Sequence, residues 1–83
     1  MDNSETVAKL TDLLRDVLDD DDVVLRPETT AKDVRGWDSL ANVRFILAVE
    51  RAFKSRFAAA EVARLKNVGE LAALIEARSA AVR

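Results

Sequence analysis

The sequence predicts an all-α fold, a bundle of three main helices and one short helix with a long first loop. Hydrophobic residues recur three and four positions apart along most of the chain, and no segment shows the alternation typical of a half-buried strand. Pro27 and Gly36 interrupt this spacing, which favours one long connection over residues 20–37. A single domain over residues 1–83 is expected. Its helices should lie at about residues 4–18, 39–53, 58–65 and 67–79.

The first expected helix has one apolar face and ends at a run of acids. Its apolar positions are Val7, Leu10, Leu14, Val17 and Leu18. The run Asp19–Asp22 places negative charge where the helix dipole disfavours it, so the helix should end there. Because this run lacks the spaced ligands and the glycine of a calcium loop, a solvated helix end is expected rather than a metal site. In the following loop, Val23, Val24 and Leu25 are expected to pack onto the core.

The second expected helix begins at Ser39, with Asp38 as its N-cap. The face expected to turn toward the core consists of Leu40, Val43, Ile46, Leu47, Val49 and Phe53. Arg44 and Arg51 are seven positions apart and should share an outward stripe.

The last two expected helices also have apolar residues along one side. Val62 and Leu65 form the core side of the short third helix. Asn67 opens the last helix, with Glu70 three residues later as a variant of the capping box. The expected buried face of that helix consists of Val68, Leu71, Leu74 and Ile75.

The composition excludes several kinds of active site. The chain has no cysteine, and therefore no thiolate nucleophile, disulfide or thiolate metal site. It also has no histidine, the most common general base and neutral metal ligand. No apolar stretch is long enough to span a bilayer, and the start of the chain lacks the basic and apolar segments of a secretory signal. We expect a cytoplasmic protein with no metal site and no membrane partner.

The net charge of −2 is unevenly distributed along the chain. Residues 1–43 carry 11 acids against five bases, a charge of −6, whereas residues 44–83 carry eight bases against four acids, a charge of +4. This polarity could orient the protein on its partners. The negative total and the lack of a concentrated basic recognition helix disfavour a helix-turn-helix DNA binder, so no nucleic-acid partner is expected.

The segment Gly36-Trp37-Asp38-Ser39-Leu40 places a serine hydroxyl in the first turn of an amphipathic helix, directly after the long loop. Unpaired backbone N–H groups and the positive end of the helix dipole converge at such a position. An anion attached to Ser39 would be stabilised there, and a phosphodiester is the natural candidate.

At Asp38, Ser39 and Leu40 the sequence resembles the acyl and peptidyl carrier protein family, whose Asp-Ser-Leu signature opens the second helix. The similarity continues at Glu50, Phe53, Phe57, Val68 and Leu71. It covers the chain from about Val7 to Ile75. The position of the tripeptide, after a helix and a long loop and before two more helices, makes the match more specific than an isolated Asp-Ser-Leu. The resemblance implies an acyl-carrier-like four-helix bundle.

The resemblance also implies a function. Ser39 would carry 4′-phosphopantetheine, transferred from coenzyme A by a phosphopantetheinyl transferase, and acyl groups would be held as thioesters on the terminal thiol of that arm. Trp37, Asp38 and Leu40 flank the attachment point and are expected to lie closest to the arm. A stand-alone, monomeric carrier would be loaded by an adenylating enzyme or an acyltransferase. It would deliver acyl intermediates to the enzymes of a fatty-acid, polyketide or other specialised pathway.

The composition agrees with a carrier that is not itself an enzyme. A thioester carrier needs a thiol, and this chain has none of its own. Without histidine the chain also lacks an evident base to activate Ser39 in the Ser–His manner. An aminoacyl or peptidyl carrier of a nonribosomal-type pathway is an alternative, as is an unmodified helical adaptor. In the adaptor, Ser39 would be a helix-start residue chosen for local hydrogen bonding. Trp37 either packs partly buried against the loop and the helix start, or contacts the arm or a partner.

The outward side of the second helix departs from the family pattern. Carriers of fatty-acid synthesis usually present a strongly acidic second helix, whereas this chain has Ala41, Arg44 and Arg51 there, with Glu50 remaining. This difference favours either simple surface drift or a dedicated set of partner enzymes. The residues expected to contact partners are Ala41, Arg44, Arg51 and Val62. Lys54 and Ser55 also stand where many relatives have a glycine, so the turn into the third helix could differ.

Overall fold

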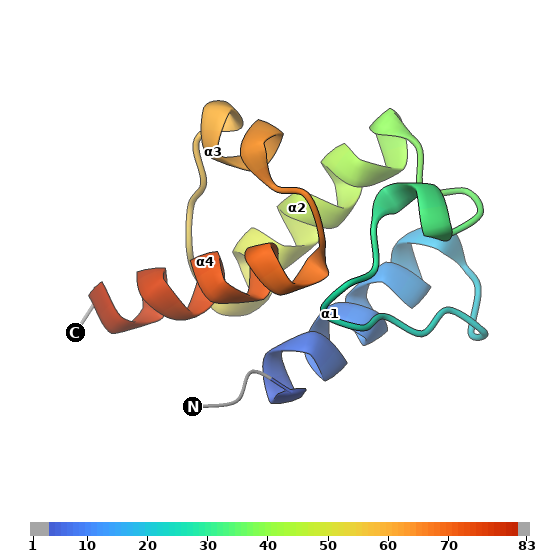
Figure 1. Ribbon diagram of the computed structural model, residues 1–83, viewed down its shortest axis with the longest axis horizontal. Helices are drawn as coiled ribbons and strands as arrows, with labels where there is room; N and C mark the ends of the chain where they lie inside the picture. The colour runs from blue at the N-terminus through green and yellow to red at the C-terminus, as the bar shows by residue number, and fades with distance from the viewer. Residues whose placement is uncertain (1–3, 82–83) are drawn as a thin grey trace.

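The computed structural model describes residues 4–81, and every regular element in that range is helical (Figure 1). The elements in chain order are α1 (Ser4–Leu18), the 3₁₀ turn η1 (Ala31–Asp33), α2 (Ser39–Phe53), α3 (Ala59–Arg64) and α4 (Val68–Ala81). The predicted all-α class is confirmed. The bounds of α1 and α2 are those expected from the sequence, α3 is one residue shorter at each end, and α4 begins one residue later and ends two later.

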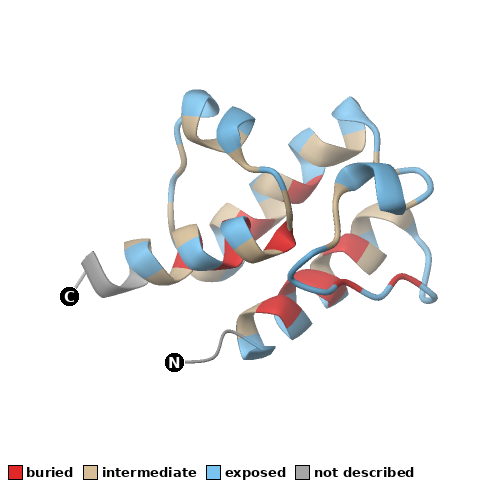
Figure 2. Cartoon of the chain, viewed as in Figure 1, coloured by how far each residue is buried: buried red, intermediate tan, exposed pale blue. Residues whose placement is uncertain are grey.

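The core lies where α1, α2 and α4 face one another, and buried residues gather on the inner faces of these helices (Figure 2). The largest fully buried side chains are Phe45, Leu10, Leu14, Ile75, Val49 and Val68. On α4, Ala72 is fully buried, whereas Leu74 is half-buried rather than buried as expected. Within residues 4–81, no helix is both long and apolar enough to cross a membrane.

The orientation of α2 differs from the prediction. Phe45 and Val49 are its buried residues, whereas three positions assigned to the core face, Leu40, Val43 and Leu47, are 63%, 57% and 53% exposed. The reason is that α2 has hydrophobic residues around most of its circumference, so its periodicity does not select one face. The packing of α1 and α4 against Phe45 selects it instead.

The long first loop is held against α1 by its backbone. Val23 and Leu25 are buried, but Val24 between them is 60% exposed, which corrects the expectation that all three pack inward. The Thr11 hydroxyl accepts a hydrogen bond from the Leu25 N–H at 3.3 Å, and the Arg15 Nε–H donates to the Val23 carbonyl at 2.7 Å. In an extended segment successive side chains point to opposite sides, which explains why Val24 faces solvent.

The same loop also caps the start of α4. The N–H groups of Val68 and Gly69 donate to the carbonyls of Thr29 and Pro27, at 2.9 and 2.7 Å. The Asn67 Oδ1 accepts from the Glu70 N–H at 2.9 Å, as the predicted cap requires. The Glu70 carboxylate, however, accepts from the N–H of Lys66 at 2.8 Å, one residue before the cap. These bonds fix the loop, and with it η1, beside the bundle.

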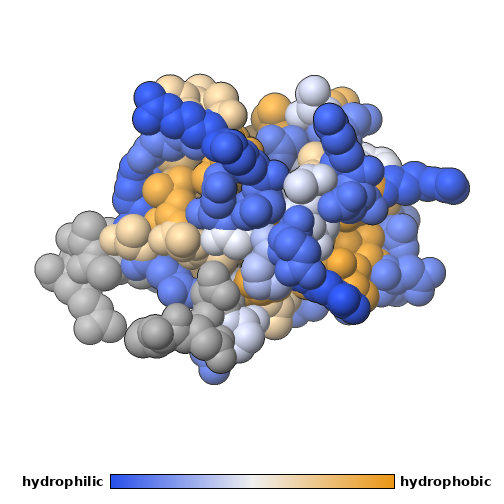
Figure 3. All heavy atoms as spheres, viewed as in Figure 1, coloured by the Kyte–Doolittle hydropathy of each residue, from blue (hydrophilic) through white to orange (hydrophobic). Residues whose placement is uncertain are grey.

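The short helix α3 has no buried residue, and it is attached to the bundle by polar contacts together with the partly buried Phe57 and Leu65 on either side of it. Arg78 on α4 pairs with the Glu61 carboxylate, donates to the Arg56 carbonyl, and lies 5.8 Å from the centre of the Phe57 ring. The Glu50 carboxylate on α2 accepts from the Phe57 N–H at 2.9 Å. Hydrophobic residues reach the surface between α3 and α4, beside hydrophilic ones (Figure 3).

Candidate functional site

The chain enters α2 through a tight turn at Gly36. The φ angle of Gly36 is +88°, a conformation that residues with a side chain rarely adopt. The Trp37 N–H donates to the Val34 carbonyl at 3.3 Å, and the Asp38 N–H donates to the Gly36 carbonyl at 3.0 Å. This turn presents the residues that follow at the molecular surface.

Asp38 is the N-cap of α2, as predicted. Its Oδ1 accepts a hydrogen bond from the Ala41 N–H at 2.8 Å, and its carbonyl accepts from the Asn42 N–H at 2.8 Å. Ser39 is therefore the first residue of the helix, fixed in place by its neighbour.

The Ser39 side chain is exposed, and within residues 4–81 it makes no hydrogen bond to another side chain or to the backbone. The capping role that a serine could take at this point belongs to Asp38. The N–H groups of Ser39 and Leu40 also have no partner in the described part of the chain. Together with the helix dipole, they favour an anion bonded to the Ser39 oxygen.

Trp37 anchors this corner to the core. Its Nε1–H donates to the Asn42 Oδ1 at 3.0 Å, and its ring meets the Phe45 ring edge-to-face at 5.4 Å and 82°. The indole is half-buried, which corresponds to the packing alternative for this residue. The partner Asn42 was not among the predicted site residues, because sequence spacing does not show which side chain an indole N–H will reach.

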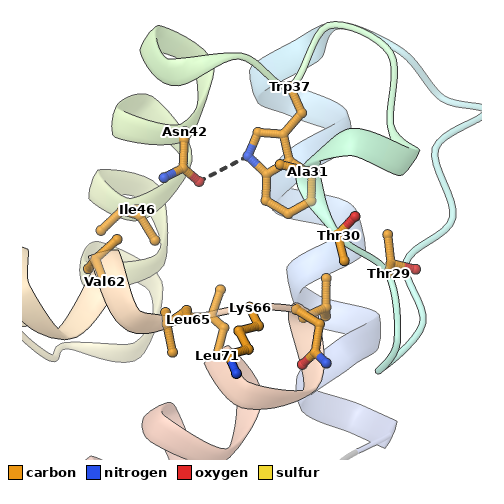
Figure 4. A pocket seen from close by; sticks show the side chains of 12 residues that line it. Thr29, Thr30, Ala31, Trp37, Asn42, Ile46, Val62, Leu65, Lys66 and Leu71 are labelled. Atoms are coloured by element: carbon orange, nitrogen blue, oxygen red, sulfur yellow. Dashed lines mark hydrogen bonds between the residues drawn. The ribbon is translucent and has the colours of Figure 1, made fainter.

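A cavity of about 130 Å³ lies next to Trp37, between η1, α2 and the connection from α3 to α4 (Figure 4). Its apolar walls include Trp37, Ile46, Val62, Leu65, Val68 and Leu71. Its polar lining consists of Thr29, Thr30, Asn42, Lys66 and Asn67. These residues come from four separate segments, so the cavity exists only once the long loop is folded onto the bundle.

A second hollow lies on the side of α2 that faces the end of α1. Leu40 and Ala41 line it together with two bases, Arg35 and Arg44, and two acids, Asp20 and Asp38. Two arginines and two aspartates, from the loop and from the start of α2, therefore share the hollow that adjoins the Ser39 turn.

The structure brings most of the predicted site residues together. Leu40, Ala41 and Arg44 share the hollow beside Ser39. Arg51 is exposed near the far end of α2, and Val62 is half-buried on α3, where it lines the cavity. The predicted residues thus group at the start of α2, whereas Arg51 near the end of α2 and Val62 on α3 lie apart from that group.

Two comparisons with known proteins bear on this site. Residues 8–75 match the family model described as a phosphopantetheine attachment site. The fold is similar to the solution NMR structure of holo acyl carrier protein from Geobacter metallireducens, with a TM-score of 0.85 and 43% sequence identity. That match covers 93% of this chain and 88% of the other.

Proposed function

Because this chain belongs to the phosphopantetheine attachment family of carrier proteins, we propose that Ser39 holds its 4′-phosphopantetheine arm. The observation that carries the proposal is the division of roles at the start of α2. Asp38 caps the helix, which leaves the Ser39 hydroxyl exposed and without a hydrogen-bond partner in the described residues. A helix-start serine kept for local hydrogen bonding would be expected to take the cap itself.

The residues around Ser39 fit the phosphodiester of such an arm. The N–H groups of Ser39 and Leu40 can donate to phosphate oxygens. Arg35 and Arg44 in the adjoining hollow offset the negative charges of Asp20 and Asp38, which line the same hollow. When bound, the arm supplies the thiol on which acyl groups are held as thioesters, and the chain itself has no cysteine. The Asp38 carboxylate is held by the Ala41 N–H at 2.8 Å, which offsets part of its repulsion toward the phosphate.

Our proposed cargo is an acyl group, delivered to partner enzymes of a fatty-acid, polyketide or other specialised pathway. The support is the cavity beside Trp37, whose walls are mostly apolar and whose volume of about 130 Å³ is close to the roughly 150 Å³ of an engineered cavity that binds benzene. A short apolar acyl chain would fit such a space. Chemistry on the thioester would take place on the partner enzymes, after a phosphopantetheinyl transferase has modified Ser39 and an adenylating enzyme or acyltransferase has loaded the arm.

The first prediction concerns attachment. After incubation with coenzyme A and a broad-specificity phosphopantetheinyl transferase, the intact mass of the chain should increase by one arm. Ser39→Ala should gain none, because no other oxygen occupies the same position. Ser4→Ala is a matched control, since Ser4 is also the first residue of a helix, and it should still gain one arm.

Either of two results would contradict the proposal: an unmodified wild-type chain, or a modified Ser39→Ala variant. The first would favour the helical adaptor. An aminoacyl or peptidyl carrier shares the attachment step, so it is separated by loading the modified protein with acyl and with aminoacyl adenylating enzymes. Accumulation of the aminoacyl form alone would favour that alternative.

A further inference from the structure

The exposed side of α2 carries an apolar stripe directly after Ser39. Leu40, Val43 and Leu47 are 63%, 57% and 53% exposed, and their spacing of three and four residues places them along one side of the helix. Of the four large hydrophobic side chains exposed in the described part of the chain, these three are on α2. Contiguous apolar exposure of this kind marks interaction surfaces in proteins.

Positive charge flanks one side of the stripe. Arg44 lines a hollow together with Leu40, and Arg51 lines another with Leu47. Both arginines are exposed, and neither forms an ion pair within the part of the chain that the structure describes. We name the surface formed by Leu40, Val43, Arg44, Leu47 and Arg51 the docking face.

Acids are fewer than bases around the docking face, and two of the nearby carboxylates also make contacts within the molecule. The Glu50 carboxylate accepts the Phe57 N–H at 2.9 Å. The Glu61 carboxylate accepts the Ala58 N–H at 2.9 Å and pairs with Arg78. The two hollows that border the docking face are lined by five bases, Arg35, Arg44, Arg51, Lys54 and Arg56, and by three acids, Asp20, Asp38 and Glu50, so the net charge beside this face is positive.

The other side of the stripe borders a concave apolar groove. Val43 and Leu47 line it from α2, and Ala59, Val62 and Ala63 line it from α3. A ridge of side chains from a folded protein fits a groove between two helices, whereas a flat lipid surface does not. A second copy of this chain would bring the same arginines toward each other across a symmetric interface, which is electrostatically unfavourable.

We propose that the docking face binds partner enzymes whose contact surface is an apolar ridge bordered by carboxylates. This inference rests on the proposed carrier function and specifies the partner chemistry. The stripe begins at Leu40, one residue after Ser39, so a partner seated on it has its surface next to the attachment point. Like-charge contacts would reject enzymes whose docking surfaces are basic, which gives the carrier specificity for acidic ones.

The test uses two designed peptides and the full-length chain without the arm. Each peptide is an amphipathic helix with leucines on one face, and the flanking positions are glutamate in one peptide and lysine in the other. Binding is followed by amide chemical shifts in ¹⁵N-labelled protein. The glutamate peptide should perturb amides of α2 and α3 and bind at least tenfold more tightly than the lysine peptide, with the difference shrinking at high salt.

Two sets of variants link the preference to the docking face. Arg44→Glu/Arg51→Glu should reverse the peptide preference, whereas Lys9→Glu/Arg26→Glu makes the same change in net charge at exposed positions elsewhere and should preserve it. Val43→Ser/Leu47→Ser should weaken binding of the glutamate peptide at least fivefold. All six substituted side chains are exposed: Lys9, Arg26, Val43, Arg44, Leu47 and Arg51. The variants should therefore fold, which circular dichroism can check.

Four results would overturn the proposal: equal binding of both peptides, a preference for the lysine peptide, shifts confined to α1 and the first loop, or a dimer formed through the docking face. Shifts of the same α2 amides with phosphatidylserine vesicles but with neither peptide would also overturn it, in favour of a membrane surface. The assay needs no arm and can be repeated on Ser39→Ala. Failure of arm attachment and failure of the docking proposal are therefore separate results.

Discussion

Lys54, the residue that follows α2, adopts the left-handed backbone conformation, with φ of +52° and ψ of +46°. Its N–H and that of Ser55 both donate to the Glu50 carbonyl, so this conformation closes the helix. A side chain at a left-handed position costs about 1–2 kcal/mol, which glycine avoids. The turn after α2 was expected to differ because it lacks a glycine. It nevertheless keeps the left-handed geometry typical of glycine, with Lys54 at that position.

Lys54→Gly is therefore expected to stabilise the protein. The relief of backbone strain exceeds the extra conformational entropy of glycine in the unfolded chain, for a net gain of about 0.5–1 kcal/mol. In a domain of this size the thermal midpoint should rise by roughly 2–8 °C. Lys54→Ala is the control, because it removes the charge and keeps the Cβ, and it should leave the midpoint nearly unchanged. A lower midpoint for Lys54→Gly would contradict the argument.

At the residue scale, the sequence alone was enough to predict three features that depend only on nearby residues in the chain. The Asp38 cap, the exposed hydroxyl of Ser39 and the glycine at position 36 depend on contacts within a few residues, which local spacing can indicate. The Trp37–Asn42 hydrogen bond was not predicted, because it depends on the rotation of α2 about its own axis.

At the scale of the elements, the start of α4 depends on close contact with the first loop. A Cβ added to Gly69 would lie 2.9 Å from the Pro27 carbonyl oxygen and 3.2 Å from its Cβ. The Gly69 N–H donates to that same carbonyl at 2.7 Å. The backbones can approach this closely only because position 69 has no side chain.

Gly69→Ala should therefore destabilise the protein, although alanine is the better helix former by about 1 kcal/mol. The added methyl group forces the loop and α4 apart, at a cost of about 1–3 kcal/mol. Chemical denaturation measures the loss. Ala73→Gly, at an exposed position of the same helix, measures how much the difference in helix propensity between alanine and glycine alone changes the stability. A Gly69→Ala variant as stable as the wild type would show that the loop can move away freely.

The helix α2 shows why the existence of an element is easier to predict than its orientation. Caps and periodicity gave its bounds, since both act within the helix. Its hydrophobic residues surround most of the axis, so burial of Phe45 and exposure of Leu40 were decided by the neighbouring helices. The stripe expected to stabilise the core is instead available to partners.

For the molecule as a whole, three helices share one apolar core, and α3 is attached at its edge by polar contacts and by partly buried hydrophobic residues on either side of it. Of the two residues expected on the core side of α3, Leu65 packs against the core, whereas Val62 is not part of it. Both are only half-buried, and they help to line the cavity beside Trp37. The attachment of α3 also depends on Glu50, Glu61 and Arg78, which come from three different helices.

The attachment of α3 should respond to pH through Glu61. The hydrogen bond from the Ala58 N–H, reinforced by the Arg78 guanidinium, holds the pKa of the Glu61 carboxyl below its ordinary value of 4.5. A depressed pKa means that the ionised carboxylate stabilises the folded state. That stabilisation is complete above the ordinary value and is lost as the pH falls through the depressed one. Because the Glu61 side chain is still one-third exposed (33%), the effect should be small and weaker in high salt.

The measurement is a titration of the Glu61 side-chain carboxyl by NMR, together with denaturation of wild type and Glu61→Gln between pH 7 and about pH 3. The Glu61 midpoint should lie below 4.5, and the stability difference between the two proteins should disappear at the acidic end. Arg78→Gln should raise the Glu61 pKa part of the way, because the Ala58 N–H remains. A midpoint at or above the ordinary value, or one that Arg78→Gln leaves unmoved, would mean that α3 is held to the bundle without this ion pair.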